Sequence, residues 1–300
     1  GTVVVEEDRI VFVGPAWEGK ASREIDATGK IVVPGFISTH AHIGSNLTTR
    51  FMGNSRMRQF VRNGFLHFAP DRRNGSTRLD QKVDSRASLR YGFAALLRGG
   101  VTTVVAYASA GSDDGAAMRE VAEEMGIRLY WAPVVSGGTY WLEDDGRVTP
   151  APDEDAGLRE IDEACEYIQK YCSDPNGRLK GLIAIDEYYL STEKSRARGK
   201  EAARALGVPF TMHFLEQHRE FFETMIDTGH TPIELLRDEG ILDTQTILAH
   251  CIYVASSSLV NYPVVDDIGI LGKTGATVAH SPAAWAGGGI TLDSFDSYRK

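Results

Sequence analysis

The sequence predicts an α/β protein of the TIM-like (β/α)8 barrel class, with a small β segment at its N-terminus. From residue 31 onward, apolar β-branched runs alternate with helical stretches, and consecutive βα units imply a parallel sheet. Histidines follow several of these runs, and in a barrel the carboxyl ends of the strands converge on one face. An open doubly wound sheet is the alternative. It is less favoured because no Gly-x-Gly-x-x-Gly motif follows the first predicted strand.

Residues 1–30 are predicted to form a small β domain, and residues 31–300 the barrel domain. In the first of these, Thr2–Glu6 and Ile10–Gly14 are rich in β-forming residues. The dipeptide Glu7-Asp8 would link them as a hairpin turn. The β domain is therefore expected to begin with a two-stranded hairpin.

The barrel domain is predicted to contain seven strands, at 31–39, 101–107, 127–135, 179–185, 208–215, 246–249 and 276–279. Helices are expected between them at 79–98, 113–125, 154–171 and 192–206, and from residue 231 to residue 240. In the last of these, Thr231-Pro232-Ile233-Glu234 combines an N-cap, a proline at the first helical position and a capping-box glutamate. A closed barrel needs eight strands. The predicted barrel therefore stops before strand 8 and should have a gap beside its first strand.

Composition excludes several classes of protein. The 300 residues include 32 Lys and Arg against 41 Asp and Glu, a net charge of −9, so nucleic acid is not an expected partner. No apolar run approaches the roughly 20 residues that a membrane span needs, so a membrane is not expected either. Cys165, Cys172 and Cys251 fit neither a disulfide framework nor a Cys-x-x-Cys metal site, which predicts a cytoplasmic protein.

Five of the eight histidines are predicted to end strands, namely His40, His42, His213, His250 and His280. A single histidine in such a position is more often a hydrogen-bonded core residue, but five are improbable by chance. His40 and His42 are two residues apart, so in a strand they share a face, as two ligands of one metal ion must.

A carboxylate accompanies one of these histidines. Glu216 lies three residues after His213, and a carboxylate close to a metal ion but not bound to it can carry protons to and from water. A salt bridge to an arginine is the alternative role for Glu216. A structural hydrogen bond is the alternative for His250 and for His280.

These motifs resemble those of the amidohydrolase superfamily, in its deaminase and chlorohydrolase (cytosine deaminase-like) branch. The segment 34–42, Pro-Gly-Phe-Ile-Ser-Thr-His-Ala-His, is similar to the first-strand His-x-His motif, and His213-Phe214-Leu215-Glu216 to the His-x-x-Glu motif. The segment 248–251 resembles the sixth-strand histidine motif, and the segment 278–282 the seventh-strand His-x-Pro motif. The resemblance extends over nearly the whole chain, and these enzymes also carry a small β-sandwich like the one expected from the N-terminal segment.

The resemblance implies one divalent metal ion, zinc or alternatively iron, held by His40, His42 and His213 with an aspartate from the eighth strand. Glu216 would move the proton, and His250 would orient or polarise the water or the substrate. His280 would contact the substrate.

Binuclear members place a carboxylated lysine at the end of the fourth strand, where this chain has Asp186-Glu187. A single ion is therefore expected.

Two features depart from the pattern of this branch. After His280 the sequence reads Ser-Pro-Ala-Ala-Trp, where members often have Cys-Pro and then Ser-Asn, so substrate recognition is expected to differ. No eighth-strand Gly-Thr-Asp segment is present, so the chain is expected to be part of a longer protein and inactive alone.

Asp293 and Asp296 are the last acids, and helical spacing around them predicts that neither binds the metal. Asp293 should instead cap that helix.

The sequence therefore predicts a metal-dependent hydrolase that cleaves a C–N or C–halide bond, with a deaminase or dechlorinase of an N-heterocycle favoured. Two alternatives are an amide, urea or carbamate hydrolase of an aryl compound and a non-catalytic barrel scaffold. A planar or aromatic small molecule is the expected partner, because aromatic side chains are predicted to rim the site. A homo-oligomer is also expected. Packing of loop against loop is the other explanation for these rings. They are Trp141, Tyr188 and Trp285, with Tyr140, Tyr189, Phe65 and Phe68.

Overall fold

The computed structural model describes residues 1–43, 85–108, 112–145, 147–174, 177–286, 289–292 and 295–299. The chain divides into two compact units, residues 1–34 and residues 35–300. The beginning of the helix predicted at 79–98 lies outside the described residues, as do Phe65, Phe68 and Asp293.

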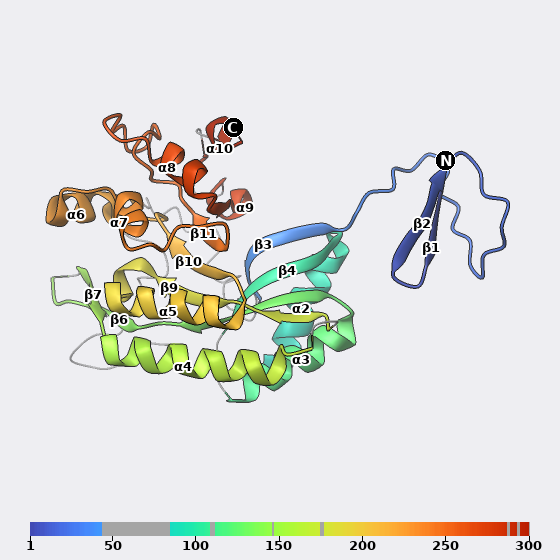
Figure 1. Ribbon diagram of the computed structural model, residues 1–300, viewed down its shortest axis with the longest axis horizontal. Helices are drawn as coiled ribbons and strands as arrows, with labels where there is room; N and C mark the ends of the chain where they lie inside the picture. Colours follow the sequence, from blue (N-terminus) through green and yellow to red (C-terminus); the bar gives the residue numbers. More distant parts are fainter. Residues whose placement is uncertain are drawn as a thin grey trace. The chain divides into compact units, whose positions relative to one another are not determined.

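The first unit contains an antiparallel hairpin of strands β1 (Thr2–Glu6) and β2 (Arg9–Gly14), drawn in dark blue in Figure 1. Glu7 has a φ of 54° in the connecting turn, a left-handed conformation that tight turns require. The hairpin is the one that the sequence predicts.

The first strand of the second unit is β3 (Phe36–His42), and the prediction of a strand at 31–39 is wrong at both ends. Pro34 has no backbone N–H to donate to a sheet ladder, so pairing cannot extend back through it. The pairing starts where the N–H of Phe36 donates to the carbonyl of Gly100 at 2.8 Å. The strand extends as far as His42. His40 and His42 therefore belong to the strand itself, and both side chains are attached to a rigid element.

The second unit is built on a parallel sheet whose strands follow one another in sequence order. The sheet order is β3-β4-β5-β9-β10-β11-β12, and β8 also pairs with β5. The strands are β4 (Val101–Ala108), β5 (Arg128–Val135), β8 (Leu179–Gly181), β9 (Ile183–Glu187), β10 (Phe210–Phe214), β11 (Thr246–His250) and β12 (Thr277–Ala279). Among the described residues, no strand joins β12 to β3, which is the gap expected from the sequence. The fold is a TIM-like barrel sheet, closed except at this gap.

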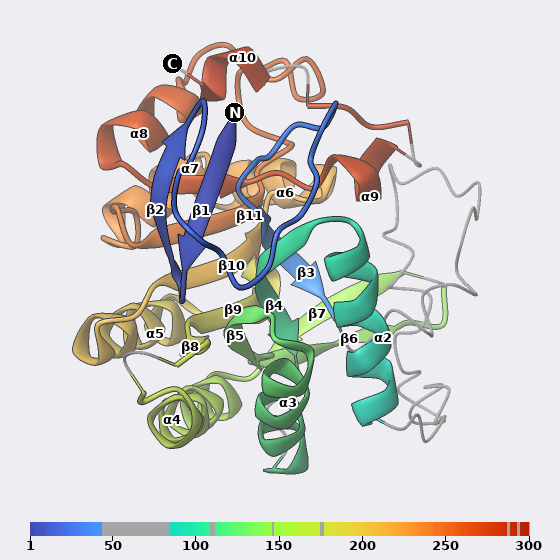
Figure 2. The same cartoon turned by 90° about the vertical axis from the view of Figure 1, so that its right-hand side faces the viewer.

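Helices connect the strands, and α2 to α5 lie outside the sheet in two perpendicular views (Figures 1 and 2). The helices described are α2 (Ser85–Arg98), α3 (Ser112–Met125), α4 (Glu154–Tyr171), α5 (Glu193–Leu206), α6 (His218–Thr228), α7 (Pro232–Asp238), α8 (Asp267–Thr274), α9 (Pro282–Ala286) and α10 (Phe295–Tyr298). The capping box predicted for α7 is present, since Thr231 and Glu234 each accept a hydrogen bond from the other's backbone N–H. Helix α4 has the bounds that the sequence predicts.

Helices α6, α8 and α9 are not among the elements predicted from the sequence, and neither is one hairpin. Strands β6 (Gly138–Leu142) and β7 (Val148–Pro152) form an antiparallel hairpin that precedes α4. Pro150 and Pro152 argue against a strand, because proline cannot donate to a ladder. A two-stranded hairpin tolerates both prolines, since each strand needs partners along only one edge.

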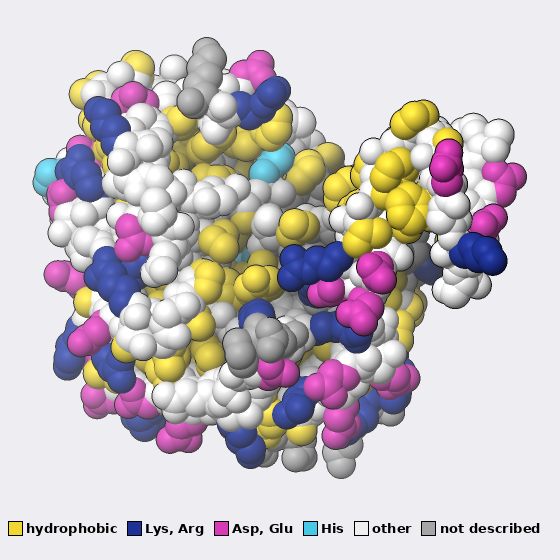
Figure 3. Space-filling model, turned by 45° about the vertical axis from the view of Figure 1, so that its right-hand side comes forward, with side chains coloured by type: hydrophobic (Ala, Val, Ile, Leu, Met, Phe, Trp, Pro, Cys, Tyr) yellow, Lys and Arg dark blue, Asp and Glu magenta, His cyan; other side chains and the backbone are white. Residues whose placement is uncertain are grey.

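The strands in the middle of the barrel sheet are largely buried. Parallel strands in a barrel are covered on both faces, which favours continuous apolar runs, and β10 is buried along its whole length. On the surface, acidic and basic side chains are interspersed over the face seen in Figure 3. No helix in the part of the chain that the structure describes is long and apolar enough to cross a membrane.

Candidate active site

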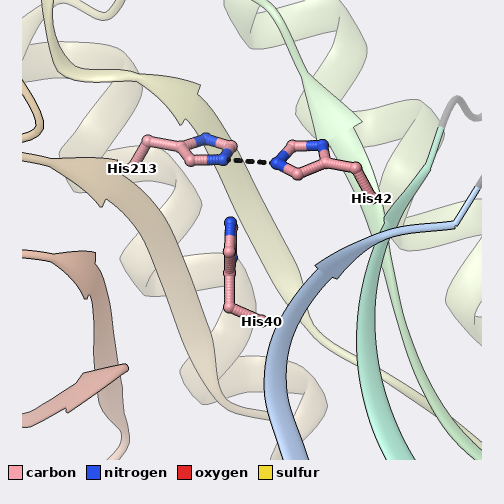
Figure 4. A group of neighbouring side chains, drawn as sticks. All are labelled: His40, His42 and His213. Carbon is pink, nitrogen blue, oxygen red and sulfur yellow. Dashed lines mark hydrogen bonds between the residues drawn. The ribbon is translucent and has the colours of Figure 1, made fainter. Parts of the chain in front are cut away.

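Three histidine rings meet at the carboxyl ends of the barrel strands. His40 and His42 come from β3 and His213 comes from β10, and one ring nitrogen of each lies within 4.8 Å of the others. The Nε2 atoms of His42 and His213 are 2.9 Å apart and face each other, while His40 points toward this pair (Figure 4). The rings of His40 and His213 meet edge to face, with centroids 4.8 Å apart.

This arrangement suits a metal ion. Two ligand nitrogens of a tetrahedral zinc ion, each bonded at about 2.0–2.1 Å, lie roughly 3.3 Å apart, close to the spacing of His42 and His213. Burial, together with the nearby rings of His213, His250 and His42, lowers the pKa of His40, so this imidazole is neutral and can act as a ligand. The buried Nδ1 of His40 has no hydrogen-bond partner among the described residues. The three residues therefore fit a bound divalent ion.

Asp186 holds His213 in place. The Nδ1 atom of His213 donates to the backbone carbonyl of Asp186, and a carboxylate oxygen of Asp186 lies 3.4 Å from the same nitrogen. With Nδ1 protonated, the lone pair of His213 is on Nε2, the nitrogen that faces His42. Burial lowers the pKa of His213, but the hydrogen bond and the charge of Asp186 outweigh it and raise the pKa. A more basic imidazole is a better metal ligand.

Replacing Asp186 by asparagine should weaken metal binding about 10- to 100-fold, the usual effect of losing a partner that orients a ligand. The backbone contact remains, so the chain should still fold. Chelator competition would measure the affinity, with the exposed residue Asp227→Asn as the control that also removes one charge. Equal affinities for Asp186→Asn and wild type would show that the Asp186 carboxylate does not support His213.

Glu216 and His250 lie beside the three histidines. The Nε2 atom of His250 is 3.4 Å from a carboxylate oxygen of Glu216, and the two side chains are only 6% and 9% exposed. The ring of His250 has its centroid 4.9 Å from that of His40 and 5.5 Å from that of His213. A buried carboxyl group and a buried imidazole are thus placed next to the candidate metal centre.

The backbone has a left-handed conformation at His250 and at Leu215, next to Glu216. His250 has a φ of 84°, and Leu215, just before Glu216, has a φ of 51°. Such conformations cost non-glycine residues about 1–3 kcal/mol each and concentrate at functional sites. Hydrogen bonds from Cys251 N to Phe214 O and from Ile252 N to Leu215 O hold the two strand ends together.

Tyr107 forms part of the floor of the site and was not singled out from the sequence. Its hydroxyl is 2.5 Å from the Thr211 hydroxyl, and its ring lies 4.7 Å from His40 and 4.6 Å from His213. Tyr107 is 2% exposed, so it supports the ligand rings from within the barrel. A polar aromatic residue near the end of a predicted barrel strand is the only sequence signal that could have found it.

The remaining predicted site residues lie in different places. Trp285 donates from its indole nitrogen to Nδ1 of His250 at 3.2 Å, so the structure brings it to the site. Tyr188 packs in the core against the Phe214 ring, 5.2 Å away, and under the Arg196 guanidinium. Trp141 is half-buried in β6.

The predictions on His280 and Asp296 concern residues farther along the chain. His280 follows β12, and its buried Nδ1 has no hydrogen-bond partner in the described part of the chain. Asp296 is exposed in α10 and is not part of the histidine group found among the described residues.

The surroundings of Glu216 are acidic. Burial raises the pKa of Glu187, and the neighbouring Glu216, Asp186 and Glu220 raise it further. Burial also raises the pKa of Glu220 to about 8, although backbone N–H groups oppose this. Buried carboxyls that keep their protons at neutral pH reduce the repulsion that several anions in one place would cause.

Comparison with known proteins identifies the family. Residues 31–285 match the model of the amidohydrolase family. The chain is 26% identical over 271 residues to the 5-methylthioadenosine/S-adenosylhomocysteine deaminase of Acetivibrio thermocellus, covering 88% of this chain and 53% of the relative. It is 24% identical to the 5'-deoxyadenosine deaminase of Methanosarcina mazei, covering 94% of this chain and 57% of the relative. The chain thus spans little more than half the length of these curated relatives.

Solved structures show the same fold. Atrazine chlorohydrolase TrzN from Arthrobacter aurescens, complexed with zinc, matches with a TM-score of 0.72 and 21% identity, covering 99% of this chain and 64% of that one. An adenosine deaminase from Xanthomonas campestris with bound zinc matches with a TM-score of 0.60 and 16% identity, covering 89% and 53%. With a family match that spans most of the chain and the histidine motifs in place on the barrel strands, this protein belongs to the amidohydrolase family.

Proposed function

We propose that the protein is a metal-dependent hydrolase that deaminates or dechlorinates a small N-heterocycle. One observation carries the proposal, namely the convergence of His40, His42 and His213 with Glu216 and His250 beside them. Two of its relatives are named as deaminases of adenosine derivatives, and a structural relative as a chlorohydrolase, which supports this class of substrate.

We propose that the three histidines hold a single divalent ion and that this ion is zinc. When bound, such an ion lowers the pKa of a coordinated water from about 16 towards about 7. Zinc is supported by the two zinc-bound structural relatives. A single ion is supported by Asp186 and Glu187 at the end of β9, where a second ion would require a carboxylated lysine. Iron is the alternative that metal analysis decides.

In the proposed reaction the carboxylate of Glu216 takes a proton from the attacking water as its oxygen bonds to an sp² carbon of the substrate. The same carboxyl group then gives that proton to the leaving group, which departs as ammonia or an amine when a C–N bond breaks. His250 donates a hydrogen bond to the charge that develops on the attacked group. Since Glu216 and His250 are both buried, these interactions act in a medium of low dielectric constant and are stronger than in water.

The substrate contacts are also proposals. We assign His280 and Trp141 to substrate binding, because an imidazole beyond the end of a barrel strand and a half-buried indole in β6 suit a planar ring. Tyr188 and Trp285 are proposed to shape the site through Phe214 and His250, the residues that they contact. The acidic net charge of the chain, −9, favours a neutral or cationic heterocycle.

Three wider predictions from the sequence are retained as proposals. Residues 1–30 would belong to a small β domain and residues 31–300 to the barrel domain. The protein would be a homo-oligomer, which light scattering can test. A cytoplasmic location is supported by Cys165, Cys172 and Cys251, which are free thiols.

The function can be tested on the complete purified protein by metal analysis and a substrate screen. Aminopurine nucleosides and chlorotriazines would be assayed for released ammonia or chloride, and aryl amides, ureas and carbamates for released arylamine. The proposal expects bound metal together with release of ammonia or chloride. Release of arylamine alone would contradict it in favour of an amide-type hydrolase. Absence of both metal and turnover would contradict it in favour of a scaffold.

A further inference from the structure

We infer that Trp285 is a positioning residue that fixes the tautomer of His250, so that His250 presents an Nε2–H group to Glu216 and to the substrate. The catalytic meaning of this inference rests on the proposed function, but its structural content does not. Trp285 lies in the segment after His280, where this chain departs from the sequence pattern of the branch that it resembles.

The hydrogen bond between the two side chains has only one possible direction. An indole nitrogen can donate but cannot accept, and Nε1 of Trp285 lies 3.2 Å from Nδ1 of His250. Nδ1 must therefore be the acceptor and carry no proton. In a neutral imidazole the proton is then on Nε2.

Packing holds this contact in place. Trp285 is 9% exposed and His250 is 5% exposed, so water does not compete freely for either nitrogen. The rings meet edge to face, with centroids 5.3 Å apart and planes at 78°. Trp285 itself is anchored in the short helix α9, and its backbone carbonyl accepts a hydrogen bond from Ile290 at 3.1 Å.

The opposite nitrogen of His250 faces the reactive side of the site. Nε2 is 3.4 Å from a carboxylate oxygen of Glu216. With the proton on Nε2, this contact joins a donor to an acceptor. With the proton on Nδ1, a lone pair of the imidazole would face the carboxylate, and Nε2 could not stabilise negative charge on the substrate.

The backbone contacts of this segment cannot replace Trp285 in this role. The φ of 84° at His250 and the hydrogen bond from Cys251 N to Phe214 O fix the direction in which the His250 side chain leaves the backbone. Neither specifies which ring nitrogen carries the proton. Among the described residues, the indole of Trp285 is the donor that the structure places against Nδ1.

The tautomer can be read directly by nitrogen NMR of the complete protein labelled with 15N-histidine, with His250 assigned by comparison with a His250→Asn variant. Wild type should show a pyridine-type nitrogen at Nδ1 and a pyrrole-type nitrogen at Nε2. In Trp285→Phe, which keeps an aromatic ring but loses the donor, both signals should shift toward the average of the two tautomers. Trp17→Phe, in residues 1–34, is the matched control and should give the wild-type pattern. A wild-type pattern in Trp285→Phe, or an Nδ1–H tautomer in wild type, would overturn the inference.

Steady-state kinetics separate positioning from substrate contact. Trp285→Phe should lower kcat on the order of tenfold with little change in KM, as expected from loss of one hydrogen bond of about 1.4 kcal/mol. A raised KM with unchanged kcat would overturn the positioning role. If Trp285→Phe does not fold, benzothienylalanine at position 285 keeps the ring shape and replaces N–H by sulfur, and the same NMR outcomes apply. If the protein proves not to be a hydrolase while the NMR pattern holds, the proposed function fails and the tautomer assignment stands.

Discussion

Replacing Glu216 by glutamine should lower kcat by at least about 100-fold and leave the metal content unchanged. Glutamine has nearly the shape of glutamate, so the contact with His250 and the local packing should survive. The amide cannot take a proton from water or return it to the leaving group, and general acid–base catalysis contributes about 10²–10⁴-fold. The measurement is kcat with ammonia or chloride release as readout, with metal analysis on the same samples.

Glu201→Gln is the matched control, because Glu201 is an exposed glutamate on α5 and its replacement should leave kcat unaltered. Near wild-type turnover in Glu216→Gln would remove Glu216 from the chemistry. Loss of metal in that variant would make Glu216 a ligand rather than a proton carrier.

Replacing His42 by alanine should abolish stable metal binding, and with it turnover. His42 is one of the three imidazoles whose nitrogens converge, and its Nε2 faces that of His213 at 2.9 Å. Loss of one of three ligands should weaken binding by more than the 10- to 100-fold that loss of a supporting partner causes. Metal analysis after dialysis against a chelator measures this directly.

His230→Ala controls for the loss of a histidine, since the His230 side chain is 55% exposed and comes from the turn before α7. Metal content should be the same in His230→Ala as in wild type. An equal metal content in His42→Ala would show that the ion is held elsewhere.

Local signals in the sequence were sufficient for much of the fold. The acids in the first turn of α4 and the Thr231 capping box of α7 act within a few residues, so the bounds of α4 and the start of α7 could be predicted. The start of β3 could not, because its first hydrogen bond is made with Gly100, far away in the sequence. The hairpin of β6 and β7 was missed because its prolines are tolerated only when strands stay unpaired on one edge.

The candidate site, like the fold, combines features set by neighbouring residues with contacts between residues far apart in the sequence. The ligand pattern at His40 and His42 is local, so strand periodicity was enough to place both rings on one face. Tyr107 contacts Thr211, 104 positions away, and Asp186 contacts His213, 27 positions away. Neither contact can be predicted from the residues next to it in the sequence. Trp285 was predicted to contact the substrate, whereas in the structure its N–H is bonded to His250. The partner of this side chain depends on how the fold places Trp285 of α9 beside His250 of β11.

The binding of one divalent ion by His40, His42 and His213 is tested most sharply by anomalous diffraction from crystals of the complete protein grown with zinc. Data collected on both sides of the zinc absorption edge should show a single strong peak, with a nitrogen of each of the three rings at about 2.0–2.3 Å from it. A peak at another place, or no peak among these three rings at full zinc loading, would contradict the assignment of this site.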